Sequence, residues 1–119
     1  MENSSTPTSA EVIDFGRLKE LFGNDDAIIQ KLFDTFVTTT PPLLAQLDTA
    51  IADADFMTIK ALGHQIAGSA ANLGAQRMHL LAREIENEAH GPANGRCHVL
   101  FDDLTVAFIE VCDVVSSTK

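Results

Sequence analysis

The apolar residues of this 119-residue chain recur at spacings of three and four, which is the period of an amphipathic helix. The pattern predicts five helical segments, joined by short turns and, over residues 90–95, by a loop rich in Gly, Pro and Asn. In chain order, the segments lie between Asp14 and Gly23, from Asn24 or Asp25 to Ile51, from Asp53 or Asp55 to Gly74, from Met78 to Ala89, and from Leu100 to Val115. Strand signals are nearly absent, with no Trp or Tyr and no alternating apolar run between turn residues. We therefore predict an all-α fold, an antiparallel up-down four-helix bundle with a short additional N-terminal helix.

Two features concern the continuity of the second segment and the extent of the domain. Pro41 and Pro42 fall inside the second segment, where proline removes a backbone hydrogen bond and clashes with the preceding turn, so a kink or a break is expected. Because the apolar period resumes after them, we favour one kinked helix over two helices. The Ser/Thr-rich residues 1–11 are predicted to be a disordered tail, and residues 12–119 to form a single bundle domain.

Composition and charge exclude several classes of function. The chain has 8 Lys and Arg against 17 Asp and Glu, and its net charge of −9 disfavours binding to nucleic acid or to an anionic membrane surface. Neither a window of 18 uninterrupted apolar residues nor a secretory signal is present, so we expect a cytoplasmic protein. We also expect it to be a monomer. Cys97 and Cys112 lie in an apolar periodic stretch without metal-ligand spacing, and we interpret both as small hydrophobic residues.

The segment between Ile59 and Gly74 carries the most informative pattern. Its predicted core stripe consists of Ile59, Leu62, Gly63, Ile66, Ala70 and Leu73. His64 lies away from this stripe, and its neighbours on the same face are Lys60, Ala67, Gly68, Ala71 and Asn72. Most of them are very small, which is unusual for a solvated helix face.

Gly68 is the most unusual residue of this face, because a glycine inside a helix costs about 1 kcal/mol relative to alanine. Close approach of another molecule beside His64 would give it a purpose. We therefore predict that a partner docks over this face, on Gln65, Ala67, Gly68, Ala71 and Asn72. Two other interpretations stay open on spacing alone. A lone surface histidine usually has no special role, and small residues can equally mark close packing between helices.

The residues around His64 resemble the histidine-containing phosphotransfer (HPt) domains of multistep phosphorelays. The stretch from His64 to Ala75, His-Gln-Ile-Ala-Gly-Ser-Ala-Ala-Asn-Leu-Gly-Ala, is close to the family pattern H-x-x-K-G-S-x-x-x-L-G. Residues 18–25 with Phe36 look like the family's opening helices, and Met78 with residues 81–86 looks like the helix that pairs with the histidine helix. The resemblance covers residues 12–116.

The resemblance implies a phosphocarrier that is not an autonomous kinase. His64 would accept a phosphoryl group from the aspartyl phosphate of a receiver domain in a hybrid histidine kinase, and pass it to the aspartate of a response regulator. Imidazole suits this role because its ordinary pKa near 6.5 leaves a neutral form with a free lone pair at pH 7. Such a carrier needs no cofactor of its own, because the partner receiver domain is expected to bring Mg²⁺ and a lysine.

One position departs from the family pattern. The family usually has a lysine three residues after the histidine, where its ammonium can offset phosphate charge, and this chain has Ala67 there. Lys60, one turn before His64, could supply part of that charge because residues four apart are neighbours on a helix. Weaker stabilisation of phosphohistidine, charge supplied by the partner, and an impaired domain all remain open.

Glu86 on the facing helix is the second candidate site residue. In the family, a polar side chain at the matching position, often Gln or Glu, holds the Nδ1–H group of the imidazole. A carboxylate there would fix the tautomer and leave Nε2 free to attack. The alternative is that Glu86 is one solvated acid among several.

Two further functions compete with the phosphocarrier. The same bundle could bind a receiver or kinase domain without transferring phosphate, as the missing lysine would allow. A bundle that binds a metal or cofactor through His79, His90 and His98 is the third possibility, but nothing in their spacing makes them converge, and we predict no metal site.

Overall fold

The computed structural model describes residues 12–89 and 95–117, which form five helices and, within those ranges, no strand. The helices are α2 (Phe15–Phe22), α3 (Asp26–Ala52), α4 (Phe56–Leu73), α5 (Gln76–Glu88) and α6 (Gly95–Ser117). Gly95 therefore begins a helix, although we predicted it to be in the loop. The predicted tail over residues 1–11 and the rest of the predicted loop, residues 90–94, lie outside the described residues.

Aspartate side chains start three of the helices. The carboxylate of Asp14 accepts from the backbone N–H of Arg17 at 3.0 Å, that of Asp25 from Ile28, and that of Asp55 from Thr58. Such caps pair backbone donors that have no partner within the first helical turn. Asp25 and Asp55 are thus the N-caps of α3 and α4, rather than the alternatives Asn24 and Asp53.

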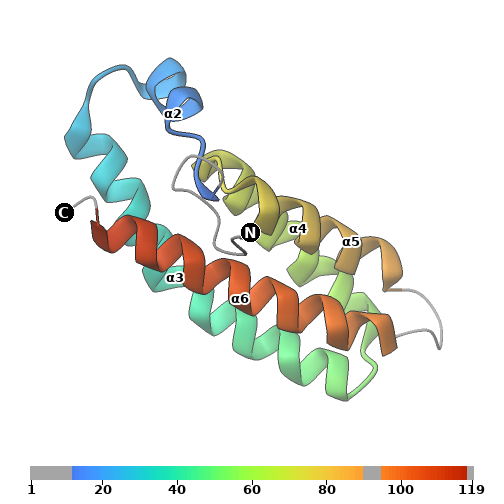
Figure 1. Cartoon of the computed structure of the whole chain (residues 1–119). Coiled ribbons are helices and arrows are strands. Elements are labelled where there is room, and N and C mark those ends of the chain that lie inside the picture. The colour runs from blue at the N-terminus through green and yellow to red at the C-terminus, as the bar shows by residue number, and fades with distance from the viewer. Residues whose placement is uncertain (1–11, 90–94, 118–119) are drawn as a thin grey trace, which may run out of the picture.

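Four long helices enclose one core. Helix α4 packs against α3 and α5, α6 packs against α5, and α6 closes the ring by packing against α3. The turns between α3 and α4 and between α4 and α5 are short, so these neighbours run antiparallel (Figure 1). The short α2 packs on α3, where Phe15 meets Phe33 edge-to-face at 6.2 Å. The predicted four-helix bundle with an additional N-terminal helix is confirmed.

Helix α3 continues through Pro41 and Pro42 as one helix, which is the continuity that we favoured over two helices. Both prolines are exposed, so the rings do not disturb the core. The hydroxyl groups of Thr38 and Thr39 donate to the carbonyl oxygens four residues earlier, at 2.7 and 2.8 Å. The accepting carbonyl groups, of Asp34 and Thr35, lie about one turn before those of Val37 and Thr38, which lose their helical N–H donors to Pro41 and Pro42.

The predicted apolar stripes form the core. On α4 the six residues that we assigned to the core are buried, and on α6 Leu104 and Val111 are at most 1% exposed. None of the helices in residues 12–89 and 95–117 has the length and apolarity that a bilayer-spanning segment needs.

Candidate functional site

His64 lies on the outer side of α4, in the middle of the helix, and its side chain is 76% exposed. The residues that flank it in sequence have opposite environments, because Gly63 is buried and Gln65 is exposed. The helical period of α4 therefore turns the imidazole toward solvent while the stripe beside it faces the core.

Glu86 of α5 holds the imidazole. Its Oε2 atom lies 3.1 Å from Nδ1 of His64, and only 16% of its side chain is exposed. An ionised carboxylate can only accept a hydrogen bond, so the contact keeps the proton on Nδ1 and leaves the lone pair on Nε2. This geometry agrees with the orienting role that we expected for Glu86.

Gly63 explains how α5 comes close enough for this bond. A Cβ atom at Gly63 would lie 3.1 Å from the carbonyl oxygen of Ala82 and 3.2 Å from the backbone nitrogen of Glu86. A larger residue would therefore press on the backbone that carries Glu86. We had assigned Gly63 only to the core stripe, and its place directly before the histidine, in a helix interior where glycine is unfavourable, was the available signal.

Gly68 has the opposite environment. A Cβ atom there would meet nothing within 4 Å, and the residue is exposed. Packing between the described helices therefore does not require this glycine. Gln65 and Asn72 are exposed and Ala71 is half-buried, so these three residues and Gly68 share the accessible face around His64.

Our placement of Ala67 on that docking face is wrong. Its side chain is only 2% exposed, and its carbonyl oxygen lies 3.0 Å from Nδ1 of His79 on α5. Ala67 follows Gly63 by four residues and precedes Ala70 by three, and all three residues are buried. The position where the family usually carries lysine therefore points toward the junction of α4 with α5.

Two basic residues lie near His64. Lys60 is exposed on α4 one turn before the histidine, as expected, and forms no ion pair within the described ranges. On α5, Nε of Arg83 lies 3.5 Å from Oε1 of Glu86. The sequence analysis missed Arg83, and its spacing of three residues from Glu86 on one helix was the signal that could have found it.

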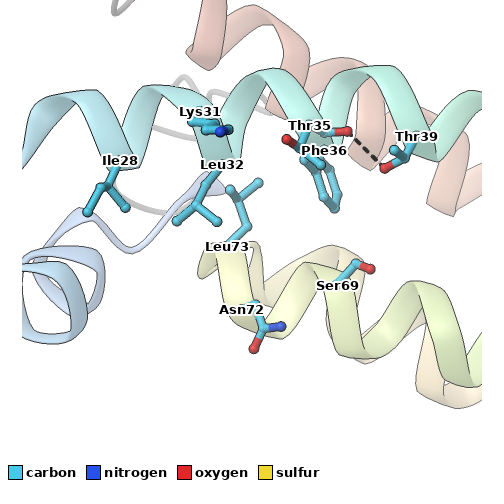
Figure 2. Close-up of a pocket in the computed structure, with 9 residues that line it drawn as sticks. All are labelled: Ile28, Lys31, Leu32, Thr35, Phe36, Thr39, Ser69, Asn72 and Leu73. Atoms are coloured by element: carbon cyan, nitrogen blue, oxygen red, sulfur yellow. Dashed lines mark hydrogen bonds between the residues drawn. The ribbon is translucent and has the colours of Figure 1, made fainter.

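A groove of about 380 Å³ borders the accessible face (Figure 2). It lies between the first half of α3 and the second half of α4, and Figure 2 shows Phe36 and Leu73 pointing into the space between these helices. Ser69 and Asn72 of α4 form one side of the groove, and Lys31 is its charged residue.

Two other histidines lie within the described residues. His79 is half-buried against α4, and His98 is exposed on α6. In the part of the chain that the structure describes, which excludes His90, no three His, Cys, Asp or Glu side chains are grouped as a metal site would require.

Comparison with known proteins identifies the family. Residues 31–110 match the family model described as the Hpt domain. The chain belongs to this family. The recognised Hpt domain covers more than half of the sequence and contains both His64 and Glu86, and its family function is histidine phosphotransfer in phosphorelays. The resemblance noted from the sequence is confirmed.

Solved structures support the same fold for this Hpt domain. It is similar to the crystal structure of histidine-containing phosphotransfer protein B (HptB) from Pseudomonas aeruginosa PAO1, with a TM-score of 0.79 and 21% sequence identity. The similarity covers 93% of this chain and 96% of that chain. A search of curated proteins found no match.

Proposed function

We propose that His64 accepts a phosphoryl group from the aspartyl phosphate of a receiver domain in a hybrid histidine kinase and passes it to the aspartate of a response regulator. The observation that carries this proposal is the pairing of an exposed imidazole with a largely buried carboxylate, 3.1 Å from Nδ1 to Oε2. This arrangement orients a nucleophile toward solvent and holds its tautomer.

The transfer needs few protein groups. The Nε2 lone pair forms the N–P bond as the P–O bond to the donor aspartate breaks, and that aspartate leaves with the electron pair. The ring becomes an imidazolium, whose Nδ1–H remains hydrogen-bonded to Glu86, so the carboxylate stabilises the charge that develops. Transfer to the second receiver reverses these steps. Mg²⁺ and a lysine from the receiver domain would neutralise the phosphoryl oxygens.

The docking surface is formed by Gln65, Gly68, Ala71 and Asn72. A receiver must bring its aspartate in line with Nε2, and the open space over Gly68 allows close approach beside the histidine. Lys60 is a candidate source of positive charge on this face, although it extends from the turn before His64. A carrier of this kind has no reaction of its own without a partner.

Phosphotransfer profiling tests the proposal. The wild type, incubated with purified receiver domains, their hybrid kinase, Mg²⁺ and ATP, is expected to gain an acid-labile, base-stable phosphoryl group. The label should disappear in His64→Gln and persist in His98→Gln, which changes another exposed histidine. A wild type that stays unlabelled with an active kinase and its phosphorylated receiver would contradict the carrier function.

A second function is favoured by one observation, the alanine at position 67. A module that binds a receiver or kinase domain without transferring phosphate would need the docking face. It would not need the lysine ammonium that the family usually has at this position. It predicts a complex with a receiver domain, detectable by calorimetry, under conditions in which His64 remains unphosphorylated.

A further inference from the structure

The carboxylate that holds His64 is itself incompletely satisfied. Oε2 of Glu86 contacts Nδ1 of His64, while Oε1 is buried and accepts no hydrogen bond from any described residue. A buried carboxylate oxygen without partners is unfavourable, and rotation of the side chain toward water would relieve it. Such a rotation would also break the bond to His64, so something must keep the carboxylate in place.

Arg83 supplies the compensating charge. Its Nε lies 3.5 Å from Oε1, and within the described ranges this is the only ion pair of the guanidinium. Arginine has five donors in a planar group, so one residue can hold a carboxylate while the rest of the guanidinium stays hydrated. The side chain of Arg83 is 54% exposed, which leaves it at the edge of the site.

The charge of Glu86 has a second consequence. A carboxylate beside the imidazole also places a negative charge close to where a phosphoryl group would be received. With Ala67 in place of the usual lysine, the histidine helix offers no ammonium three residues after His64. The guanidinium of Arg83, on α5, lies against Oε1, the carboxylate oxygen that does not contact Nδ1 of His64.

We propose that Arg83 is a positioning residue of the His64 site, which acts through Glu86 by holding its carboxylate against Nδ1 and offsetting its charge. This role rests on the proposed function of His64 as a phosphoryl acceptor. It requires neither contact of Arg83 with the phosphoryl group nor a contribution of the ion pair to stability, which for exposed pairs of this kind is small.

The chain contains a matched control on the same helix. Arg77 is 50% exposed and pairs with Glu110 at 3.4 Å, but on the side of α5 that faces α6. The experiment compares Arg83→Gln, Arg83→Lys and Arg77→Gln, with Arg83→Gln also made in a Glu86→Gln background. Glutamine at position 86 keeps a carbonyl acceptor for Nδ1–H and removes the charge.

Two measurements are made on each variant. Imidazole ¹⁵N NMR of the full chain reports the fraction of His64 protonated at Nδ1 and needs no partner. Phosphotransfer from a phosphorylated receiver domain reports the rate. We expect Arg83→Gln to release the Glu86 carboxylate from Nδ1, and therefore to lower the Nδ1-protonated fraction of the neutral imidazole and to slow transfer about fivefold, a coupling typical of neighbouring charged groups. Arg83→Lys should restore part of both, and Arg77→Gln should change neither.

The double variant decides how Arg83 acts. Loss of its effect in the Glu86→Gln background supports the positioning role, because the charge that it offsets is gone. An equal loss of rate in both backgrounds would mean that Arg83 contacts the phosphoryl group or the partner, and would overturn the proposal. An Arg83→Gln spectrum and rate like those of Arg77→Gln would overturn it as well. A wild type that is never labelled would refute the carrier function, while the NMR comparison would still test Arg83.

Discussion

At the scale of single residues, two glycines of α4 have opposite structural reasons. Gly63 and Gly68 are five residues apart, and only Gly63 is enclosed, by the backbone of α5. The first glycine allows α5 to approach the histidine helix, and the second leaves space at the surface. Substitutions at the two positions therefore test helix packing and access to the surface beside His64 separately.

Gly63→Ala should weaken the bundle and loosen the His64–Glu86 bond. The new methyl group would press on the carbonyl of Ala82 and the backbone of Glu86, which cannot yield without moving α5. Overpacking costs about 1–3 kcal/mol, and the better helix propensity of alanine returns up to about 1 kcal/mol. We expect the free energy of unfolding, measured in urea, to fall by about 1–2 kcal/mol.

Gly68→Ala is the control for this substitution, because it adds the same methyl group to the same helix without a contact. It should raise the free energy of unfolding by up to about 1 kcal/mol. If both substitutions stabilised the protein, the close contact at Gly63 would be refuted.

Residue patterns predicted part of the site. His64 and Glu86 could be found because an exposed histidine and a carboxylate on the facing helix follow from helical spacing and the family pattern. The error at Ala67 arose because helical spacing does not decide whether a residue at the border between the exposed and buried faces is exposed. That depends on the rotation of α4 against α5, which is set by the packing of Gly63, Ala67 and Ala70. Arg83 contacts Glu86 on α5 and not the histidine helix, so only its spacing from Glu86 along α5, and no spacing within α4, could indicate it.

At the scale of elements, local sequence placed the boundaries of α2 to α5 to within two residues, whereas α6 begins at Gly95, five residues before the predicted Leu100. Asp14, Asp25 and Asp55 are N-caps, and Gly23 and Gly74 follow the last residues of α2 and α4. Where two nearby residues were candidate N-caps, the choice between them depended on geometry. Asp53 is the C-cap of α3, which left Asp55 to start α4.

Asp55→Ala should destabilise α4 at its N-terminus. The carboxylate accepts from the backbone N–H of Thr58 at 3.3 Å and from its hydroxyl group at 2.7 Å, and both bonds would be lost. Loss of an N-cap costs about 1 kcal/mol, which we expect as a decrease in the free energy of unfolding. Asp53→Ala, two residues earlier, removes an equal charge without removing the α4 cap and should have a smaller effect. Equal effects would show that charge and not capping is responsible.

At the scale of the whole molecule, the pKa values of the two thiols reflect their burial in the bundle. Cys97 is fully buried and Cys112 is half-buried. Burial, followed by the charge of Glu88, raises the pKa of the Cys97 thiol above its ordinary value of 9.0. Burial, followed by Asp113, raises the pKa of Cys112.

These pKa shifts predict a loss of stability in alkali. The unfolded thiols ionise at lower pH than the folded ones, so above pH 9.0 the unfolded state binds fewer protons and the free energy of unfolding falls as the pH rises. Below that pH the stabilisation is fully present. Urea titrations between pH 8 and pH 10.5 should show the decrease, and a Cys97→Ala/Cys112→Ala variant should show a shallower one. Parallel pH profiles would contradict this origin.

The turn between α4 and α5 has a consequence for how this protein can vary in length. The carbonyl oxygen of Gly74 accepts from the backbone N–H of Asp14 at 2.9 Å, and a Cβ atom at Gly74, whose φ is +78°, would lie 3.1 Å from the carbonyl oxygen of Asp14. Asp14, which precedes α2, thus packs on the turn of the helical hairpin formed by α4, which carries His64, and α5, which carries Glu86. One inserted residue here, if absorbed into α5, would rotate that helix by about 100° about its axis and turn Glu86 away from the imidazole. Homologous chains that keep this site should therefore tolerate insertions elsewhere but conserve the length of this hairpin.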